Sequence, residues 1–198
     1  MAKRKTVNRS AAADPRWTSD VAPAPGELKI VQAFVNTAGR RKHAEELASP
    51  RALASWLAQW RLAPEDLELR SAHLELAKAL RDGFRALLRH NNGAALDKPA
   101  AARFEAAAAE TPLRLRVGTD GGPYLTAMGE GAGALGRLLG IFAEARFGVS
   151  WPRFKACPDA DCGAAFYDAT KNLAGKWCSA RCNNRNAARR SRRRRRLT

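Results

Sequence analysis

The chain has 198 residues, and 45% of them are hydrophobic, so it can form one core of moderate size and is not wholly disordered. No stretch approaches the roughly 20 consecutive apolar residues that span a bilayer, and no apolar segment follows the basic N-terminus as it would in a signal peptide. The net charge of +16 is concentrated at the two ends: residues 1–9 carry +4, residues 153–198 carry +10, and residues 10–152 only +2. Such asymmetry indicates a polyanionic partner, which is nucleic acid or an anionic membrane surface. Of these we expect nucleic acid, with no membrane association, in a cytoplasmic protein.

In chain order, the first expected element is a disordered basic tail over residues 1–26, which ends in the linker-like DVAPAPGE. A helical domain is expected over residues 27–150. Its first helical pattern starts at Leu28, where Leu28, Val31, Phe34 and Val35 fall on one face.

Two longer helices should follow. Ser49 before Pro50 predicts an N-cap with proline at the first helical position, and the apolar residues of 53–60 then recur at i, i+3, i+4 and i+7. Pro64 predicts the start of the next helix, which should end at the Asn-Asn-Gly of residues 91–93. A short alanine-rich helix is expected over residues 103–110.

The apolar period then changes. The sequence PLRLRVGTDGGPYLTAM alternates around a turn rich in Asp and Gly and predicts a β-hairpin. The following GEGAGALG lacks the Lys-Ser/Thr ending of a phosphate loop. A last helix should bury the apolar residues of 135–147, including Phe147. The expected fold is mainly α (α+β): a multihelical N-terminal domain with one β-hairpin, and then a small unit over residues 151–198.

All four cysteines lie in that small unit, in the pattern C-x4-C, 15 residues, C-x3-C: Cys157, Cys162, Cys178 and Cys182. Each short loop lets two sulfurs converge on one ion, and four thiolates fill the tetrahedral shell of Zn²⁺. The pattern therefore predicts one structural zinc ion with no site left open for a substrate. Two disulfides and an iron–sulfur cluster are the alternative interpretations.

The segments around the cysteines suggest a treble-clef-like finger. AAFYD and GKWC have the composition of strands, and the ATKNLAG between them has that of a turn. Ser179 can cap a helix that starts beside the second cysteine pair. Phe166 and Trp177 are the expected small core beneath the metal.

These residues also resemble a known family. DCG at 161–163, F-x-D at 166–168, Asn172, WC at 177–178 and CNNR-x-x-ARR from Cys182 are similar to the CGNR zinc finger, which is named after a Cys-Gly-Asn-Arg motif. Asn183 stands where that family has Gly; Asn is the residue that tolerates left-handed backbone geometry next best.

Upstream, FVNT at 34–37 and SPRALASWL at 49–57 resemble the ABATE domain, which precedes this finger in bacterial stress-response transcription regulators. What the two resemblances together imply is DNA binding and transcriptional control. Asn36 of FVNT could face a ligand pocket, or could serve as a cap or turn residue.

The chain ends in a basic helix without an acidic residue, and its nine arginines are the candidate nucleic-acid contacts: Arg181, Arg185, Arg189, Arg190, Arg192, Arg193, Arg194, Arg195 and Arg196. On a helix, residues 181, 185, 189, 192 and 196 form one stripe. Arg185, one turn beyond Cys182, is the expected base-reading arginine, whereas the run 192–196 should contact phosphate only. Asn183, Asn184 and Asn186 could read adenine, or could cap or fill a turn.

The functional prediction is a nucleic-acid-binding protein, most simply a DNA-binding transcription regulator associated with the nucleoid. Its helical domain would sense a small-molecule effector or mediate assembly. No nucleophile and base stand at a motif spacing, so we do not expect an enzyme. An RNA-binding or ribosome-associated module is the first alternative, because phosphate affinity does not separate DNA from RNA. A protein–protein adaptor with a purely structural finger is the second. The sequence does not determine the oligomeric state.

Overall fold

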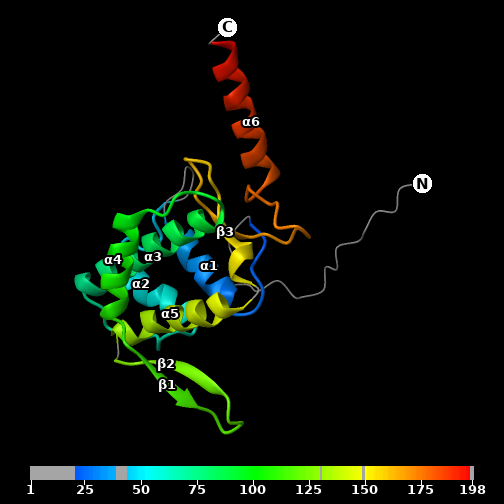
Figure 1. The fold of residues 1–198 in the computed structure, drawn as a ribbon. Coiled ribbons are helices and arrows are strands. Elements are labelled where there is room, and N and C mark those ends of the chain that lie inside the picture. Colours follow the sequence, from blue (N-terminus) through cyan, green and yellow to red (C-terminus); the bar gives the residue numbers. More distant parts are fainter. Residues whose placement is uncertain (1–20, 39–43, 130, 149, 197–198) are drawn as a thin grey trace.

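The computed structural model describes residues 21–38, 44–129, 131–148 and 150–196. Within them the fold is mainly α, as expected: five helices pack together, one hairpin projects from them, and a last helix extends away on the other side (Figure 1). The five packed helices are α1 (Leu28–Asn36), α2 (Pro50–Gln59), α3 (Ser71–Asn91), α4 (Lys98–Ala109) and α5 (Gly131–Phe147). In this part of the chain, no helix is long and apolar enough to cross a bilayer.

The long helix α3 lies at the centre of the packing and contacts all four other helices. Its buried Leu80 and Phe84 meet Phe34 of α1 and Leu138 of α5 in one apolar core. The α2 cap is confirmed, since the Ser49 side chain accepts a hydrogen bond from the amide of Ala52. Its local signals were sufficient because a cap and its partner lie three residues apart.

The predicted start of α3 at Pro64 is wrong. The helix begins at Ser71 after the extended backbone of Arg70, and residues 67–70 lie outside any helix, with Leu67 and Leu69 half-buried and Glu68 and Arg70 exposed. Two apolar side chains two residues apart reach the same core only from an extended backbone. α4 begins five residues earlier than predicted, because Asp97 caps it by accepting from the amide of Ala100.

The hairpin prediction is confirmed by β1 (Leu113–Val117) and β2 (Pro123–Ala127), which pair antiparallel with Leu115 opposite Leu125. Leu115 and Val117 are nevertheless 66% and 69% exposed. Phe147, expected in the core, is 91% exposed at the end of α5, so that expectation is also wrong. The helix has turned the side chain of its last residue away from the packed core.

The C-terminal unit starts with a 3₁₀ turn, η1 (Trp151–Arg153), followed by β3 (Phe154–Ala156). β3 pairs antiparallel with β4 (Ala165–Tyr167), which lies in the predicted AAFYD strand. The partner strand was expected at GKWC, residues 175–178, but these residues are not a strand. The helix predicted after Ser179 is α6 (Ala180–Arg195).

Residues 1–20 of the predicted tail lie outside the described residues. Within 21–26, contrary to the expected linker, Val21 and Ala24 are buried, and the Gln32 side chain binds the amide of Ala24 and the carbonyl of Ala22. Val21 packs beside Phe166 and Ala164 under the cysteines, where Trp177 was expected; Trp177 itself is only partly buried.

Candidate metal centre and nucleic-acid interface

The four cysteine sulfurs converge from two segments. Cys157 follows β3 and Cys162 ends its loop, whereas Cys178 and Cys182 flank the start of α6. All four sulfurs lie within 4.8 Å of one another, and Cys178 Sγ is 3.6 Å from both Cys162 Sγ and Cys182 Sγ. A tetrahedral ion with Zn–S bonds of about 2.3 Å places its sulfurs about 3.8 Å apart. The sulfur cluster therefore fits one zinc ion.

The loop of the first pair is fixed by its backbone. The amide of Cys157 donates to the carbonyl of Ala164 at 2.8 Å, and the amides of Cys162 and Gly163 donate to the carbonyl of Asp159. Gly163 has a φ of +59°, a conformation that costs glycine little. This tight turn presents both sulfurs on one side.

The second pair sits at a helix N-terminus. Ser179 caps α6 by accepting from the amide of Cys182, so Cys182 lies in the first turn, where the helix dipole favours a thiolate. Hydrogen bonds to Cys157 and Cys162, together with burial, raise the pKa of Cys178, whereas the hydrogen bond to Cys157 lowers the pKa of Cys162. Four crowded thiols cannot all ionise alone, and a divalent cation would remove that conflict.

A buried carboxylate fastens α6 to the first cysteine loop. Asp159 is fully buried; it accepts from Arg185 Nε at 2.6 Å, from Asn186 Nδ2 at 2.7 Å and from Arg189 Nη1 at 3.4 Å. Burial opposes the ionisation of Asp159, but the hydrogen bonds from Arg185, from the amide of Asp161 and from Asn186, with the charge of Arg185, together keep the pKa of Asp159 below its ordinary value. Arg185 also donates to Cys182 Sγ at 3.1 Å. Arg189 reaches Asp161 as well, at 2.5 Å.

A second buried ion pair holds the loop between the cysteine pairs. Lys155 Nζ lies 2.7 Å from Asp168 Oδ2 and also donates to the carbonyls of Leu173 and Gly175. Asp168 accepts further from Thr170 and from the amide of Gly175. Burial opposes the ionisation of Asp168, but the Lys155 and Thr170 hydrogen bonds lower its pKa to about 2. The F-x-D motif thus provides a packed ring and a buried carboxylate.

The finger is joined to the helical domain by side-chain amides. Asn36 accepts from the amide of Ala165 and donates to its carbonyl, and Gln32 also donates to that carbonyl. Asn36 therefore neither faces a ligand pocket nor caps its own helix; it holds β4. At the end of α3, Asn91 donates to the carbonyls of Trp151 and Phe154, and Asn92 to that of Ala156.

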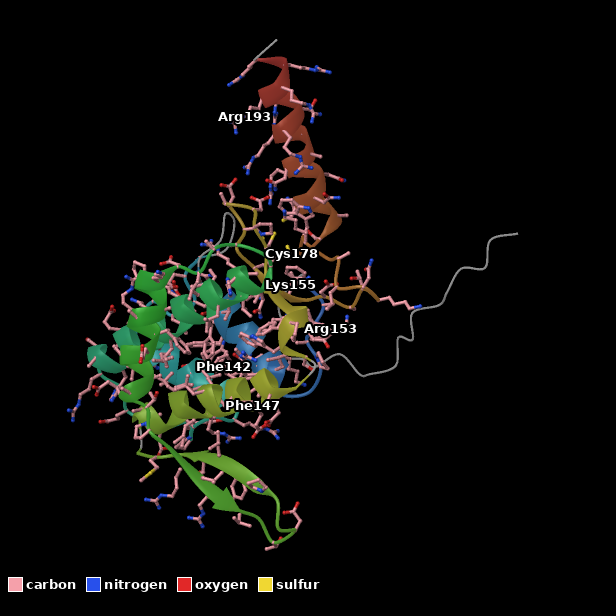
Figure 2. All side chains as sticks on the ribbon, in the orientation of Figure 1. Phe142, Phe147, Arg153, Lys155, Cys178 and Arg193 are labelled. Carbon is pink, nitrogen blue, oxygen red and sulfur yellow. The ribbon has the colours of Figure 1, made fainter. Side chains whose placement is uncertain are left out.

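The two parts also share apolar contacts. Aromatic rings follow one another from the domain into the finger, with Phe84, Phe142, Trp151 and Phe154 in successive edge contacts of 5.4, 4.9 and 6.3 Å between centroids. In Figure 2, Phe142 lies within the packed helices, and Lys155 and Arg153 of the finger lie above it and to the right. β3 and β4 contribute Phe154, Ala156 and Ala165 to the main core.

The predicted arginine contacts divide into two groups. Arg185 and Arg189 are held against Asp159, and the Arg185 side chain is only 17% exposed. The remaining seven are exposed along α6 and its end: Arg181, Arg190, Arg192, Arg193, Arg194, Arg195 and Arg196. Arg193 lies well out along the projecting helix (Figure 2). The predicted stripe of five arginines is thus partly occupied by contacts within the finger.

The three asparagines divide in the same way. Asn186 binds Asp159 and the carbonyl of Cys182, whereas Asn183 and Asn184 are exposed. Asn183 is an ordinary helical residue, so its replacement of the family's Gly requires no left-handed backbone. Two roles were not identified from the sequence: that of Asp159 beside the metal centre and that of Asn36 in holding β4. The one sequence signal for Asp159 was its position between two cysteines.

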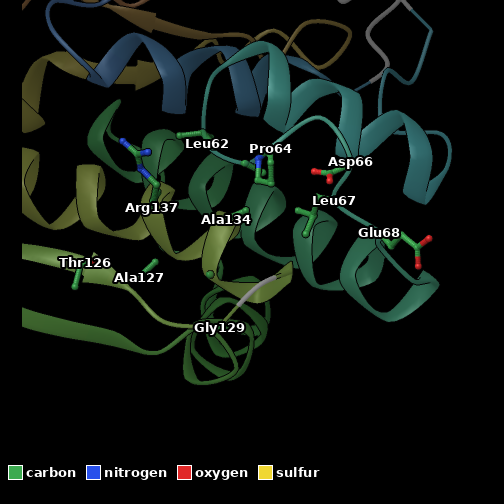
Figure 3. A pocket seen from close by; sticks show the side chains of 12 residues that line it. Leu62, Pro64, Asp66, Leu67, Glu68, Thr126, Ala127, Gly129, Ala134 and Arg137 are labelled. Carbon is green, nitrogen blue, oxygen red and sulfur yellow. The ribbon is translucent and has the colours of Figure 1, made fainter.

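The helical domain carries a cavity of about 620 Å³ between residues 62–68, β2 and the first half of α5. Leu62, Leu67 and Ala134 give it apolar walls, and Asp66 and Arg137 lie on opposite sides of it (Figure 3). The glycine-rich start of α5 permits close packing here: a Cβ on Gly136 would lie 2.8 Å from that of Ala127. The segment that lacked a phosphate-loop pattern is a packing surface for β2.

The models of two known families match separate parts of the chain. Residues 28–147 match the model of the ABATE family, described as "Putative stress-induced transcription regulator". Residues 153–195 match the model of the CGNR zinc finger. Neither is an enzyme family. No curated protein sequence matches the chain.

Proposed function

Because the chain belongs to the ABATE family and ends in a CGNR zinc finger, we propose that it is a DNA-binding transcription regulator. The proposal depends most on the exposed positive charge of α6. This helix projects from the body (Figure 1). The helix and Arg196, which follows it, together carry seven exposed arginines and no acidic residue.

Charge supports this assignment. Neighbouring arginines on one helix repel each other, and phosphates relieve that repulsion. Guanidinium groups bind phosphate oxygens in a bidentate manner, so a helix of this composition has high affinity for a nucleic-acid backbone.

The finger would fix the position of α6 on the nucleic acid. The zinc ion, when bound, fixes the start of α6, and Asp159 fastens the next two turns through Arg185 and Arg189. Four cysteines complete the shell of the ion, so its chemistry at this site is structural. We therefore assign the chain a binding role in the cytoplasm rather than a catalytic one.

The cavity between β2 and α5 is the proposed effector site. Its volume is in the usual range for small ligands, and its walls combine apolar side chains with Asp66 and Arg137. A small amphipathic molecule with charged groups fits this lining.

The test is titration of the zinc-loaded chain with a labelled random-sequence DNA duplex at several salt concentrations. Affinity should fall linearly on a log–log plot against salt, with a slope of about −0.9 for each phosphate neutralised. A parallel titration with duplex and single-stranded RNA identifies an RNA-binding module if RNA binds more tightly. Absence of binding to all of them overturns the proposal and favours a protein–protein adaptor. Sequencing the nucleic acid that copurifies with the chain from cells would then identify its natural class.

A further inference from the structure

Helix α6 has one face that contacts the first cysteine loop and an opposite face that is mostly exposed. One face carries residues 182, 185, 186 and 189, which recur at spacings of three and four. Cys182 belongs to the cysteine cluster, and the other three bind Asp159 in the loop between Cys157 and Cys162. The opposite face carries Asn183, Asn184, Ala187 and Ser191. The first three of these are exposed.

From these two faces we propose that Asn183 and Asn184, and not Arg185, are the side chains that read base edges. The proposal rests on the DNA-binding function proposed above and assigns its specificity. Arg185 is a positioning residue, because its Nε binds Asp159 and its Nη2 binds Cys182 Sγ. A side chain already engaged within the protein must give up those bonds before it can bind a base.

The outward face has the shape required for groove reading. One turn after the two asparagines, Ala187 and Ala188 are exposed. Because their side chains are small, the backbone of α6 can approach the groove floor closely. A carboxamide binds adenine in a bidentate arrangement, accepting from the N6 amino group and donating to N7. Both asparagines lie in the first turn and a half of the helix, where the cysteines and Ser179 fix the backbone.

The arginines beside this face are placed to bind the DNA backbone. At 3.6 residues per turn, Arg181 and Arg190 fall on opposite flanks of α6, with the outward face between them. A helix lying in the major groove has one phosphate strand on each flank. Exposed arginines on both flanks therefore complement the occupant that the proposal names, which is the major groove of duplex DNA.

The experiment begins with selection of a preferred duplex from a random library by the zinc-loaded full chain. Asn183→Ala and Asn184→Ala are then titrated on the selected and on a random duplex. Each substitution should weaken binding to the selected duplex by about 5- to 100-fold and leave binding to the random duplex unchanged within about twofold. Both positions are exposed, so the variants should keep their zinc, which is measured for each of them. Arg190→Ala, on the flank of the same helix, is the matched control and should weaken binding to both duplexes alike.

A second measurement identifies the atom that is read. Replacing single adenines of the selected duplex by 7-deazaadenine removes N7. The replacement should weaken binding of the wild-type chain but not of the corresponding asparagine variant, which is the signature of a direct contact in a double-mutant cycle.

The outcomes distinguish a failure of this assignment from a failure of the DNA-binding function on which it rests. If the wild-type chain does not bind duplex DNA, the proposed function fails. If it binds in a salt-dependent way but yields no preferred duplex, or if both asparagine variants behave as the wild type on the selected duplex, the function stands and the assignment of Asn183 and Asn184 is wrong. Equal weakening on both duplexes would also overturn the assignment, because the asparagines would then contact only the backbone.

Discussion

The side-chain amide of Asn36 pairs with the backbone of Ala165, 129 residues further along the chain, through hydrogen bonds of 2.8 and 3.1 Å. The pairing is buried and imitates the exchange between two strands: the amide accepts from the N–H and donates to the C=O. It fastens the strand that precedes the second cysteine pair to the first helix of the ABATE domain. The stability of the finger therefore depends on the domain.

Asn36→Ala should destabilise the whole chain, because it leaves the buried amide of Ala165 without a partner and deprives its carbonyl of one. Each such group costs about 1–3 kcal/mol. Urea denaturation of the zinc-loaded protein measures the destabilisation. Asn184→Ala removes the same side chain from an exposed position and should change the free energy of unfolding by less than about 0.5 kcal/mol. Equal effects of the two substitutions would contradict the role given to Asn36.

Asp159→Asn should weaken sequence-specific DNA binding although it makes the chain more positive. The substitution removes the charge that holds Arg185 and Arg189, and breaking such a buried pair costs about 3–5 kcal/mol. Hydrogen exchange of α6 amides should show a loosened helix start. Asp161→Asn changes the charge by the same amount, but Asp161 is exposed and, among the described residues, pairs with Arg189 alone. It should leave binding unchanged or slightly stronger; tighter binding by both variants would mean that charge alone matters.

Metal analysis should give one zinc ion per chain, and Cys178→Ser should abolish its binding. Zinc provides about 10–16 kcal/mol in small units of this kind, so the finger should lose the dispersion of its proton NMR signals. Because Phe154 and Ala156 belong to the core shared with the helices, the thermal transition of the helical domain should also move to lower temperature. An unchanged transition would show that the domain does not depend on the finger.

Replacing Arg192–Arg196 by alanine should weaken binding to every duplex alike. Five consecutive residues point around the whole circumference of a helix, so they cannot all face base edges. The slope of log K against log salt should become less steep, by about 0.9 for each phosphate that the variant no longer neutralises. Titrations on selected and random duplexes measure both effects. Weakening confined to the selected duplex would instead place base contacts in this run.

The sequence alone determined what depends on neighbours along the chain. The four-cysteine spacing predicted the metal centre because each ligand pair lies within six residues, and Ser49 and Ser179 predicted helix starts because a cap acts over three. The hairpin and the mainly helical class followed from the period of the apolar residues.

Contacts between distant segments decided the rest. The strand that pairs with β4 lies before the first cysteine and not between the pairs, because β3 packs on α3 and is held there by Asn91 and Asn92. Arg185 has the same charge as the other arginines of α6, and only the fold places the buried Asp159, 26 residues earlier, against it. An exposed arginine and an anchored one look alike in sequence, since burial and hydrogen-bond partners are properties of the packed chain.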